Sequence, residues 1–246
     1  MLGKLVKYDM LKYKSFLLFY LTVPVIAAIT HFTNAIDNKS VAMVIIDKTL
    51  SGCTIGLMLG LAINLLMRFF VNFNLSLFGD EGYLYNTLPV KRGTLYTSKA
   101  LTAVVSIIYA AVITIASILI IIGTAVGDVD AGWKVLLVTF VLGIAEMICI
   151  VLTVFLGIIL GNRKDTHKKL WSIIFSVCVY AIEQAIPFAY IFIRFGNVIL
   201  TENDDKLQEQ MFGLGFILPM IAVYVAYSVI MYFLGKRALE KGINID

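Results

Sequence analysis

The chain has 246 residues, of which 60% are hydrophobic and only 15% are charged, and its formal net charge is +4. A soluble domain of this length could not bury so much apolar surface, so the composition excludes an ordinary soluble protein and makes lipid the main solvent. The excess of basic residues is explained by their positions between membrane spans, described below, so it does not indicate binding to nucleic acid.

Six stretches of the chain are long and apolar enough to cross a bilayer, which takes about 20 residues each. The connections between them are too short for a second soluble domain. We therefore expect one all-α integral membrane domain over residues 1–246, with six transmembrane helices. The predicted spans cover residues 16–35, 52–78, 101–126, 133–160, 170–195 and 212–235.

Residues 1–15 have the pattern of an amphipathic helix lying along the inner face of the membrane. Asp9 falls within the apolar arc, which counts against this interpretation, and a solvated tail is the alternative. The start also has features of a signal peptide, but the stretch before the first span is long and patterned, so we expect that span to be retained. The apolar arc holds Leu2, Leu5, Val6, Met10, Tyr13 and Phe16, and the opposite arc holds Lys4, Lys7 and Lys14.

The second predicted span carries a ridge of small residues, Gly52, Gly56 and Gly60, at four-residue spacing. Such a ridge allows another helix to approach closely. The partner is either a helix of the same bundle or a helix of a second subunit. The sequence favours packing within the bundle and leaves the subunit interface as the alternative.

The same span is too long for the bilayer. Residues 52–78 would measure about 40 Å at 1.5 Å per residue, against roughly 30 Å of hydrocarbon. We expect its end, with Arg68, Asn72 and Asn74, to project into the cytoplasm. A projecting end is a surface that a partner on that side could bind.

The connection at residues 79–92, with the sequence GDEGYLYNTLPVKR, is the most unusual segment. A purely solvated loop would not need so many large apolar side chains. A short amphipathic helix here would hold its acids at its positive N-terminal end and present its apolar groups to a partner or to the membrane face. A capped turn between two spans is the alternative. Glycines frame the acids, and the large side chains are Tyr83, Leu84, Tyr85 and Leu88.

The longer segment FGDEGYLYNTLPVKRGTLYTSK resembles the connection between the second and third spans of small bacterial ABC export permeases of the type-two family. In that family this connection forms the coupling helix that contacts the ATPase. The resemblance covers the topology of the whole chain, including the N-terminal amphipathic helix and the basic tail at residues 235–241. Its specific motif spans only some twenty residues, so it indicates the family and not the substrate.

The resemblance implies that the coupling residues are Gly79, Asp80, Glu81, Gly82, Tyr83, Leu84, Leu88 and Pro89. It implies no catalytic residue in this chain. Consistently, the phosphate-binding motif G-x-x-x-x-G-K-[ST] is absent from the sequence, so we expect no cofactor here. ATP and magnesium would bind to a separate ATPase subunit, present in two copies.

Proline interrupts three of the predicted spans, at Pro24, Pro187 and Pro219. Each proline removes the hydrogen bond to the carbonyl four residues earlier. Kinks of this kind are tolerated where neighbouring groups or water satisfy the backbone, so they suggest a hinge or a cavity. The freed carbonyls belong to Tyr20, Glu183 and Gly215.

Two acids, Glu146 and Glu183, lie deep within the fourth and fifth spans. They are almost equally far in sequence from the turn near residue 165, so antiparallel helices would place them at similar depth. Together with Pro187 they are candidates for the substrate path. The alternatives are neutral acids hydrogen-bonded between helices, contact with cationic groups of a substrate, and proton coupling.

The basic residues gather in alternate connections. Fourteen of the 20 lie at the two ends of the chain and in the second and fourth connections, whereas the other loops hold five and Arg68 lies within a span. Lysine and arginine near span ends remain on the cytoplasmic side. The pattern therefore predicts that both termini are cytoplasmic.

Neither a disulfide nor a metal site is predicted. Cys53, Cys149 and Cys178 fall inside spans and far apart in sequence, so we expect them to be reduced. His31 ends the first span and His167 lies in the fourth connection, too far apart in the topology to share a metal. Both histidines fit an interfacial position.

The leading interpretation is the permease subunit of an ATP-driven exporter in a bacterial plasma membrane. It would work with the ATPase and with a second, identical or sister, permease, surrounded by lipid. The resemblance implies export of amphipathic or antimicrobial peptides or similar hydrophobic compounds, and leaves drugs, lipids and ions open. An ion-coupled transporter that uses Glu146 and Glu183 is the alternative. A membrane enzyme fits less well. Such an enzyme needs clustered metal ligands or a nucleophile beside its base, whereas the acids and histidines of this chain are scattered along the sequence.

Overall fold

The computed structural model describes residues 2–34, 36, 40–79, 82, 90–122, 130–164, 166–199 and 214–241. In this part of the chain all regular structure is helical, and six helical stretches are long and apolar enough to cross a membrane. The prediction of an all-α protein is therefore confirmed for the described residues, together with six helical stretches suited to cross a membrane. The helices are α1 (Leu2–Phe19), α2 (Thr22–Asn34), α3 (Val41–Phe78), α5 (Arg92–Ile122), α6 (Asp130–Gly161), α7 (Lys168–Ile199) and α9 (Leu214–Glu240).

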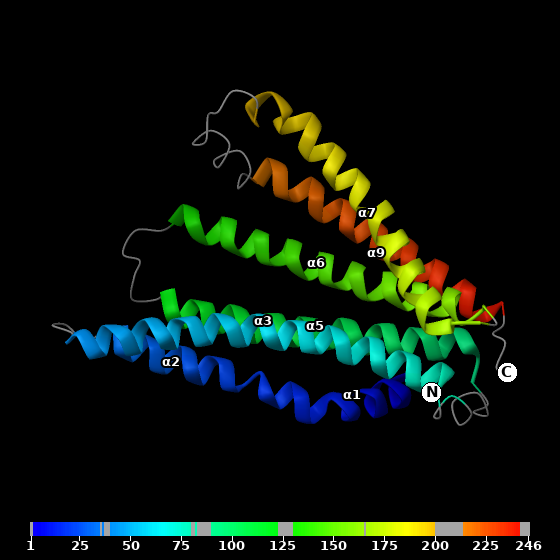
Figure 1. Ribbon diagram of the computed structural model, residues 1–246, viewed down its shortest axis with the longest axis horizontal. Coiled ribbons are helices and arrows are strands. Elements are labelled where there is room, and N and C mark those ends of the chain that lie inside the picture. The colour runs from blue at the N-terminus through cyan, green and yellow to red at the C-terminus, as the bar shows by residue number, and fades with distance from the viewer. Residues whose placement is uncertain are drawn as a thin grey trace.

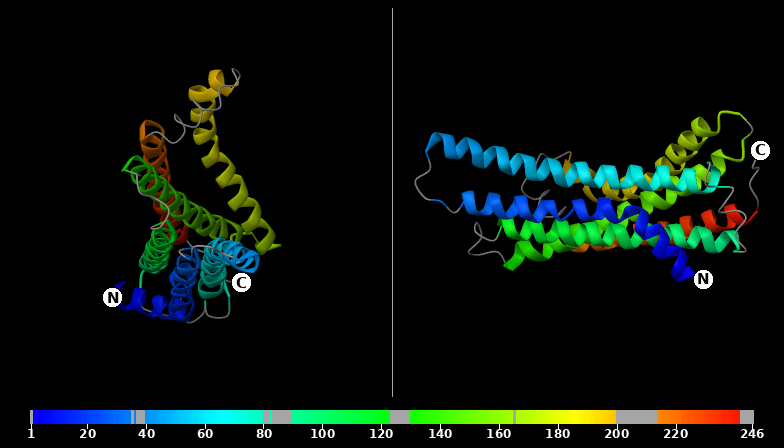
Figure 2. Two further views of the ribbon diagram at one scale, coloured as in Figure 1. Left: turned by 90° about the vertical axis from the view of Figure 1, so that its left-hand side faces the viewer. Right: turned by 90° about the horizontal axis from the view of Figure 1, so that it is seen from below.

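The helices converge at one end of the molecule, which we call the convergent end, and separate toward the other (Figure 1). At the convergent end α1, α5 and α7 begin, and α3, α6 and α9 end. Helix α6 lies in the middle and packs on α7 and α9, whereas α1 and α2 pack on α5. Figure 2 shows the opposite end, where α7 lies well apart from α3. Leu2 and Lys241, the two ends of the described chain, both lie at the convergent end. That this end faces the cytoplasm remains a prediction.

The first membrane stretch is divided at Tyr20 and Leu21, because Pro24 follows closely. Pro24 cannot donate to the Tyr20 carbonyl, which accepts instead from the Val23 amide at 3.1 Å. Helix α1 therefore continues to Phe19, beyond the predicted end of the amphipathic helix at residue 15. Its predicted apolar arc faces the bundle and packs on α5. The pattern of α1 thus reflects packing on protein, and its place along the membrane surface remains a prediction.

Helix α3 begins at Val41, eleven residues before the predicted span. Ser40 caps this start by accepting a hydrogen bond from the Met43 amide at 3.4 Å. The sequence prediction had counted Lys48 among the charges of the first loop. Asp47 is instead 5% exposed and accepts a hydrogen bond from the Thr33 hydroxyl of α2 at 3.2 Å.

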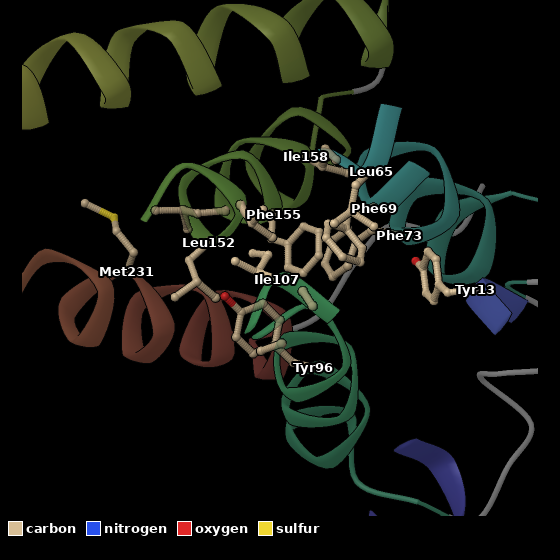
Figure 3. Packing of buried hydrophobic residues seen from close by; sticks show 14 of the residues in the cluster. Tyr13, Leu65, Phe69, Phe73, Tyr96, Ile107, Leu152, Phe155, Ile158 and Met231 are labelled. Atoms are coloured by element: carbon tan, nitrogen blue, oxygen red, sulfur yellow. The ribbon is translucent and has the colours of Figure 1, made fainter. Parts of the chain in front are cut away.

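The main hydrophobic core lies toward the convergent end and is rich in aromatic rings (Figure 3). Phe73 of α3 stacks on Phe155 of α6, with ring centroids 3.9 Å apart, and meets Tyr96 of α5 edge-on at 6.3 Å. Tyr13 of α1 packs edge-on against Phe69 of α3 at 5.2 Å. These contacts join four helices at one level of the bundle.

The end of α3 is not a free stalk, because one of its faces is buried in the bundle, and its projection into the cytoplasm remains a prediction. Leu65, Phe69, Phe73 and Leu77 recur every four residues, and all are at most 3% exposed. The opposite face of this stretch is exposed and apolar, since Met67, Val71 and Leu75 are 45% to 59% exposed. Arg68, beside the buried stripe, lies over the Phe16 ring at 4.4 Å. The four-residue spacing of these apolar residues was visible in the sequence. It was not used, because the prediction relied on the length of the span.

Helices α6 and α7 approach each other closely through small residues. A Cβ added at Gly157 would lie 2.7 Å from the Ser176 amide nitrogen, and one added at Gly161 would clash with the backbone of Ser172. Glycine on α6 thus faces serine on α7 at two successive turns. This ridge was not singled out from the sequence, although its four-residue spacing was visible there.

The glycine ridge on α3 is placed differently. Within the described part of the chain, a Cβ added at Gly52, Gly56 or Gly60 would meet nothing within 4 Å. The expectation that this ridge packs within the bundle is therefore wrong. The ridge lies on the outer surface of α3, and its use as a subunit interface remains a prediction.

Candidate functional site

The predicted coupling segment begins in a tight turn fixed to the end of α3. The Gly79 amide donates to the Asn74 and Leu75 carbonyls at 3.1 and 3.2 Å, and the Gly82 amide donates to the Gly79 carbonyl at 2.8 Å. A Cβ added at Gly82 would lie 2.8 Å from the Leu77 carbonyl oxygen, so glycine is needed for this close approach. The other predicted coupling residues lie outside the described residues: Asp80, Glu81, Tyr83, Leu84, Leu88 and Pro89.

Both ends of this segment adjoin the core. Leu77, on the side of α3, and Tyr96, on the side of α5, are 2% and 0% exposed. Tyr96 also packs against α9, where a Cβ added at Gly235 would lie 2.6 Å from the Tyr96 Cζ. The residues next to both ends of the segment are thus packed in the bundle, and Tyr96 links α5 to α9.

An ion pair between α1 and α5 lies near the same end. The Lys99 ammonium lies 2.6 Å from one Asp9 carboxylate oxygen, and the Ser98 hydroxyl donates to the other at 2.8 Å. Asp9 and Lys99 are 2% and 8% exposed. Asp9, which seemed out of place in an apolar arc, is thus the residue that fixes α1 to α5.

A second polar cluster lies within the membrane between α6, α7 and α9. The Thr153 hydroxyl of α6 lies 2.6 and 2.8 Å from the two Glu183 carboxyl oxygens of α7, and Glu183 is 1% exposed. The Cys149 thiol is a near neighbour of this carboxyl. On the outer side of the cluster, the Tyr224 hydroxyl of α9 donates to Gln184 Oε1 at 3.2 Å. Glu183 is therefore hydrogen-bonded between helices, as the structural alternative proposed.

Glu146 and Glu183, which the sequence predicts at similar depth, are offset along α6 by about one to two helical turns. The Glu183 carboxyl contacts Cys149 and Thr153, which follow Glu146 by three and seven residues. Three to seven residues of helix span about 5 to 10 Å. The count assumed a turn centred near residue 165, whereas the glycine–serine contacts between α6 and α7 are centred between residues 166 and 167.

Glu146 is the more accessible of the two acids. It is partly exposed, and within the described part of the chain its carboxyl makes no hydrogen bond. Tyr180 of α7 and Tyr224 of α9 lie close enough to interact with it electrostatically. Because Glu146 is partly exposed and Glu183 is 1% exposed, a cationic group would reach Glu146 more easily than Glu183.

Pro187 is buried on the same face of α7 as Glu183, one turn farther along. Because proline has no amide hydrogen, the backbone carbonyl of Glu183 loses its helical donor. Helix α7 nevertheless continues through Pro187. The Glu183 carbonyl thus lacks its helical donor, whereas the Glu183 carboxyl contacts Thr153.

Sequence reasoning missed the partners of these acids. Thr153 was not noticed because threonine is common within membrane helices, where it bonds its own backbone. Lys99 was counted only as a loop charge that sets topology. A search for the partner of each acid inside an apolar stretch would have included Lys99 and Thr153 as candidates.

No protein-family model, no curated protein and no solved structure matches this chain. The functional argument therefore depends on the residues and their arrangement.

Proposed function

We propose that this chain is the membrane-spanning permease subunit of an ABC exporter whose ATPase is a separate polypeptide. The observation that carries the proposal is the position of segment 79–92. Its two ends join α3 and α5 at the convergent end, beside a core shared by α1, α3, α5 and α6. Force applied there by a partner would act on several spans together. The resemblance of this segment to a coupling helix supports the same function.

The orientation follows from the charges. The convergent end carries the basic residues that we assign to the cytoplasm, such as Lys4, Arg163 and Arg237. Membrane proteins retain such residues on the cytoplasmic side. An ATPase, which needs cytoplasmic ATP, would thus meet segment 79–92 on the correct side of the membrane.

A second permease subunit, identical or sister, would complete the exporter. The exposed glycine ridge of α3 supports this part of the proposal, since no described helix of the chain covers it. Large apolar side chains flank the ridge, and Ile55, Leu59 and Ile63 are 59% to 63% exposed. Helices in lipid associate through such small-residue surfaces.

The exported compound would be an amphipathic or antimicrobial peptide or a similar hydrophobic molecule. Glu146 supports a role for cationic groups in the cargo, because it is a partly exposed acid inside the membrane. Glu183 and Pro187 would support the wall of the substrate path without contacting the cargo directly, since Glu183 is enclosed between α6 and α7.

The test is purification of this chain from its host in mild detergent, followed by identification of co-purifying proteins and by transport assays in vesicles. We expect an ATPase in a one-to-one ratio, and transport that requires ATP. Leu88→Asp should abolish both the association and the ATP-dependent transport. Val41→Asp adds the same charge at an 80% exposed position at the opposite end of α3 and should preserve the association.

An ion-coupled transporter is the second candidate, favoured by one observation: Glu183 is a fully buried membrane acid whose described contacts include no basic side chain. Its signature is transport driven by a proton gradient in vesicles without any ATPase. That result, together with wild-type transport by Leu88→Asp, would replace the exporter proposal.

A further inference from the structure

A groove of about 360 Å³ lies where α1 crosses α5 obliquely (Figure 2). This volume is within the range of ligand sites in proteins, roughly 300–1,000 Å³. The groove is open to its surroundings, since Leu11, Leu18 and Val105 line it and are 44% to 52% exposed. All of its lining residues belong to α1 or α5, so it is separate from the glycine ridge of α3 and from the acids of α6 and α7.

Basic and apolar side chains line different ends of this groove. Helix α1 begins at the convergent end, so Lys7 is the lining residue of α1 nearest to that end. Lys14 and Leu18 follow at about 10 and 16 Å along the helix, and their spacing places them on the same face as Lys7. Val105 and Tyr109 continue the apolar wall on α5. The groove therefore has a basic end toward the convergent end and an apolar end toward the middle of the bundle.

Among the described residues, no carboxylate balances the two lysines. Both are exposed, and neither forms an ion pair in this part of the chain. Asp9 is the one acid in the sequences of α1 and α5. It is 2% exposed, and its two oxygens accept hydrogen bonds from Lys99 and Ser98. Lys7 and Lys14 thus place two positive charges at one end of an apolar groove, which is complementary to an anionic group joined to a hydrocarbon chain.

We propose that this groove binds one anionic phospholipid from the leaflet at the convergent end. The lipid phosphate lies between the ammonium groups of Lys7 and Lys14, and one acyl chain lies along Leu18 and Val105. A lipid fits better than a partner helix, because the order of basic and apolar side chains matches the order of headgroup and chain. The proposal is independent of the ATPase, because every residue that it uses belongs to this chain.

The lysines determine which lipid the groove selects. Hydrocarbon chains gain little when they leave bulk lipid for an apolar groove, since both surroundings are equally apolar. Basic residues at a membrane surface, in contrast, attract anionic headgroups. The expected gain in affinity is roughly 5-fold for each lysine and about 30-fold for the two together. Salt should weaken this preference, because it screens exposed charges.

The test measures lipid binding to the purified full chain in mild detergent by native mass spectrometry. The probes are dioleoylphosphatidylglycerol, which carries one negative charge, and dioleoylphosphatidylcholine, which has the same chains and no net charge. We expect the first phosphatidylglycerol to bind about 30-fold more tightly than the first phosphatidylcholine. Glycerophosphoglycerol, which is the headgroup without chains, should not displace the bound lipid.

Two double variants test the charges. Lys7→Gln with Lys14→Gln should lower the affinity for phosphatidylglycerol about 30-fold, to that for phosphatidylcholine. Lys169→Gln with Lys241→Gln removes the same charge at two exposed positions outside the groove and should keep the preference. All four side chains are exposed, so these changes should leave the fold intact.

Two single variants test the groove. Val105→Trp adds bulk inside it and should weaken binding of both lipids several-fold. Val112→Trp adds the same bulk two turns farther along α5, at a 59% exposed position outside the groove, and should bind lipid as the parent does.

Four results would overturn the proposal. They are equal affinity of the parent for the two lipids, displacement of the lipid by glycerophosphoglycerol, equal losses of preference in the two double variants, and equal lipid binding by Val105→Trp and Val112→Trp. The double variants test the site even if Val105→Trp lowers the stability of the protein.

Discussion

The ring of Phe73 on α3 lies nearly parallel to the ring of Phe155 on α6, with centroids 3.9 Å apart and an angle of 10° between planes. Both rings are at most 2% exposed. Because α3 and α6 separate away from the convergent end, this stack is a direct link between the two halves of the bundle.

Removal of one ring of this stack should lower the stability of the protein. We expect Phe155→Ala to lower the free energy of unfolding by about 3–5 kcal/mol, since it creates a cavity in a packed core. Phe192→Ala deletes the same ring at a 75% exposed position and should change stability little. Thermal unfolding of both variants in one detergent gives the comparison, and equal melting temperatures would contradict the assigned core.

The Asp9–Lys99 pair gives a second prediction. Asp9→Ala removes the carboxylate that faces the buried Lys99 ammonium, and breaking a buried ion pair typically costs about 3–5 kcal/mol. The double variant Asp9→Leu with Lys99→Met replaces the charges by apolar groups and should recover most of that loss. Unfolding free energies of the single and double variants form the test. If the double variant is as unstable as Asp9→Ala, the loss of stability does not come from an unbalanced buried charge, and the prediction is wrong.

The glycines of α6 and α3 should respond in opposite directions to the same change. Gly157→Ala places a methyl group against the Ser176 backbone and should cost about 1–3 kcal/mol. Gly56→Ala meets open space and should stabilise the isolated chain by up to about 1 kcal/mol, because alanine is the better helix former. A loss at Gly56→Ala in the isolated chain would argue against the outward position of that ridge.

The contact between Thr153 and Glu183 predicts separable effects on stability and transport. Thr153→Val removes the donor and should cost about 1–2 kcal/mol, the upper range for a hydrogen bond between membrane helices. Glu146→Gln removes a more accessible acid and should leave stability unchanged while it reduces substrate-stimulated ATPase activity several-fold, if the proposed exporter function holds. Glu183→Gln should alter the same activity more than it alters assembly. If substrate still stimulates ATPase activity to the parent level in both glutamine variants, the two acids have a purely structural role.

The number and approximate position of the spans could be predicted from the sequence, because the cost of exposing polar groups to hydrocarbon makes long apolar runs unambiguous. The start of α3 could not, since Asp47 and Lys48 interrupt the apolar run and only the contact of Asp47 with Thr33 explains the longer helix. Local composition carries no information about such a partner.

Lateral relationships were harder still to predict. The register of α6 against α7 depends on which small residues meet, so a count around residue 165 placed Glu183 about one turn too close to Glu146. The four-residue spacing that marks Gly52, Gly56 and Gly60 also marks Gly157 and Gly161. Only the second pair packs within the described bundle, because spacing alone does not say which face of a helix meets a neighbour.

Asp9 and Lys99 are separated by 90 positions in the chain. A ribosome that adds about 5–20 residues per second needs roughly 5–18 s to make that interval. During this time the Asp9 carboxylate has no Lys99 to bind, so α1 cannot take up its final position when it is first made. The contact between α1 and α5 can therefore form only after α5 has been made, so the first span is synthesised well before the helix on which it packs.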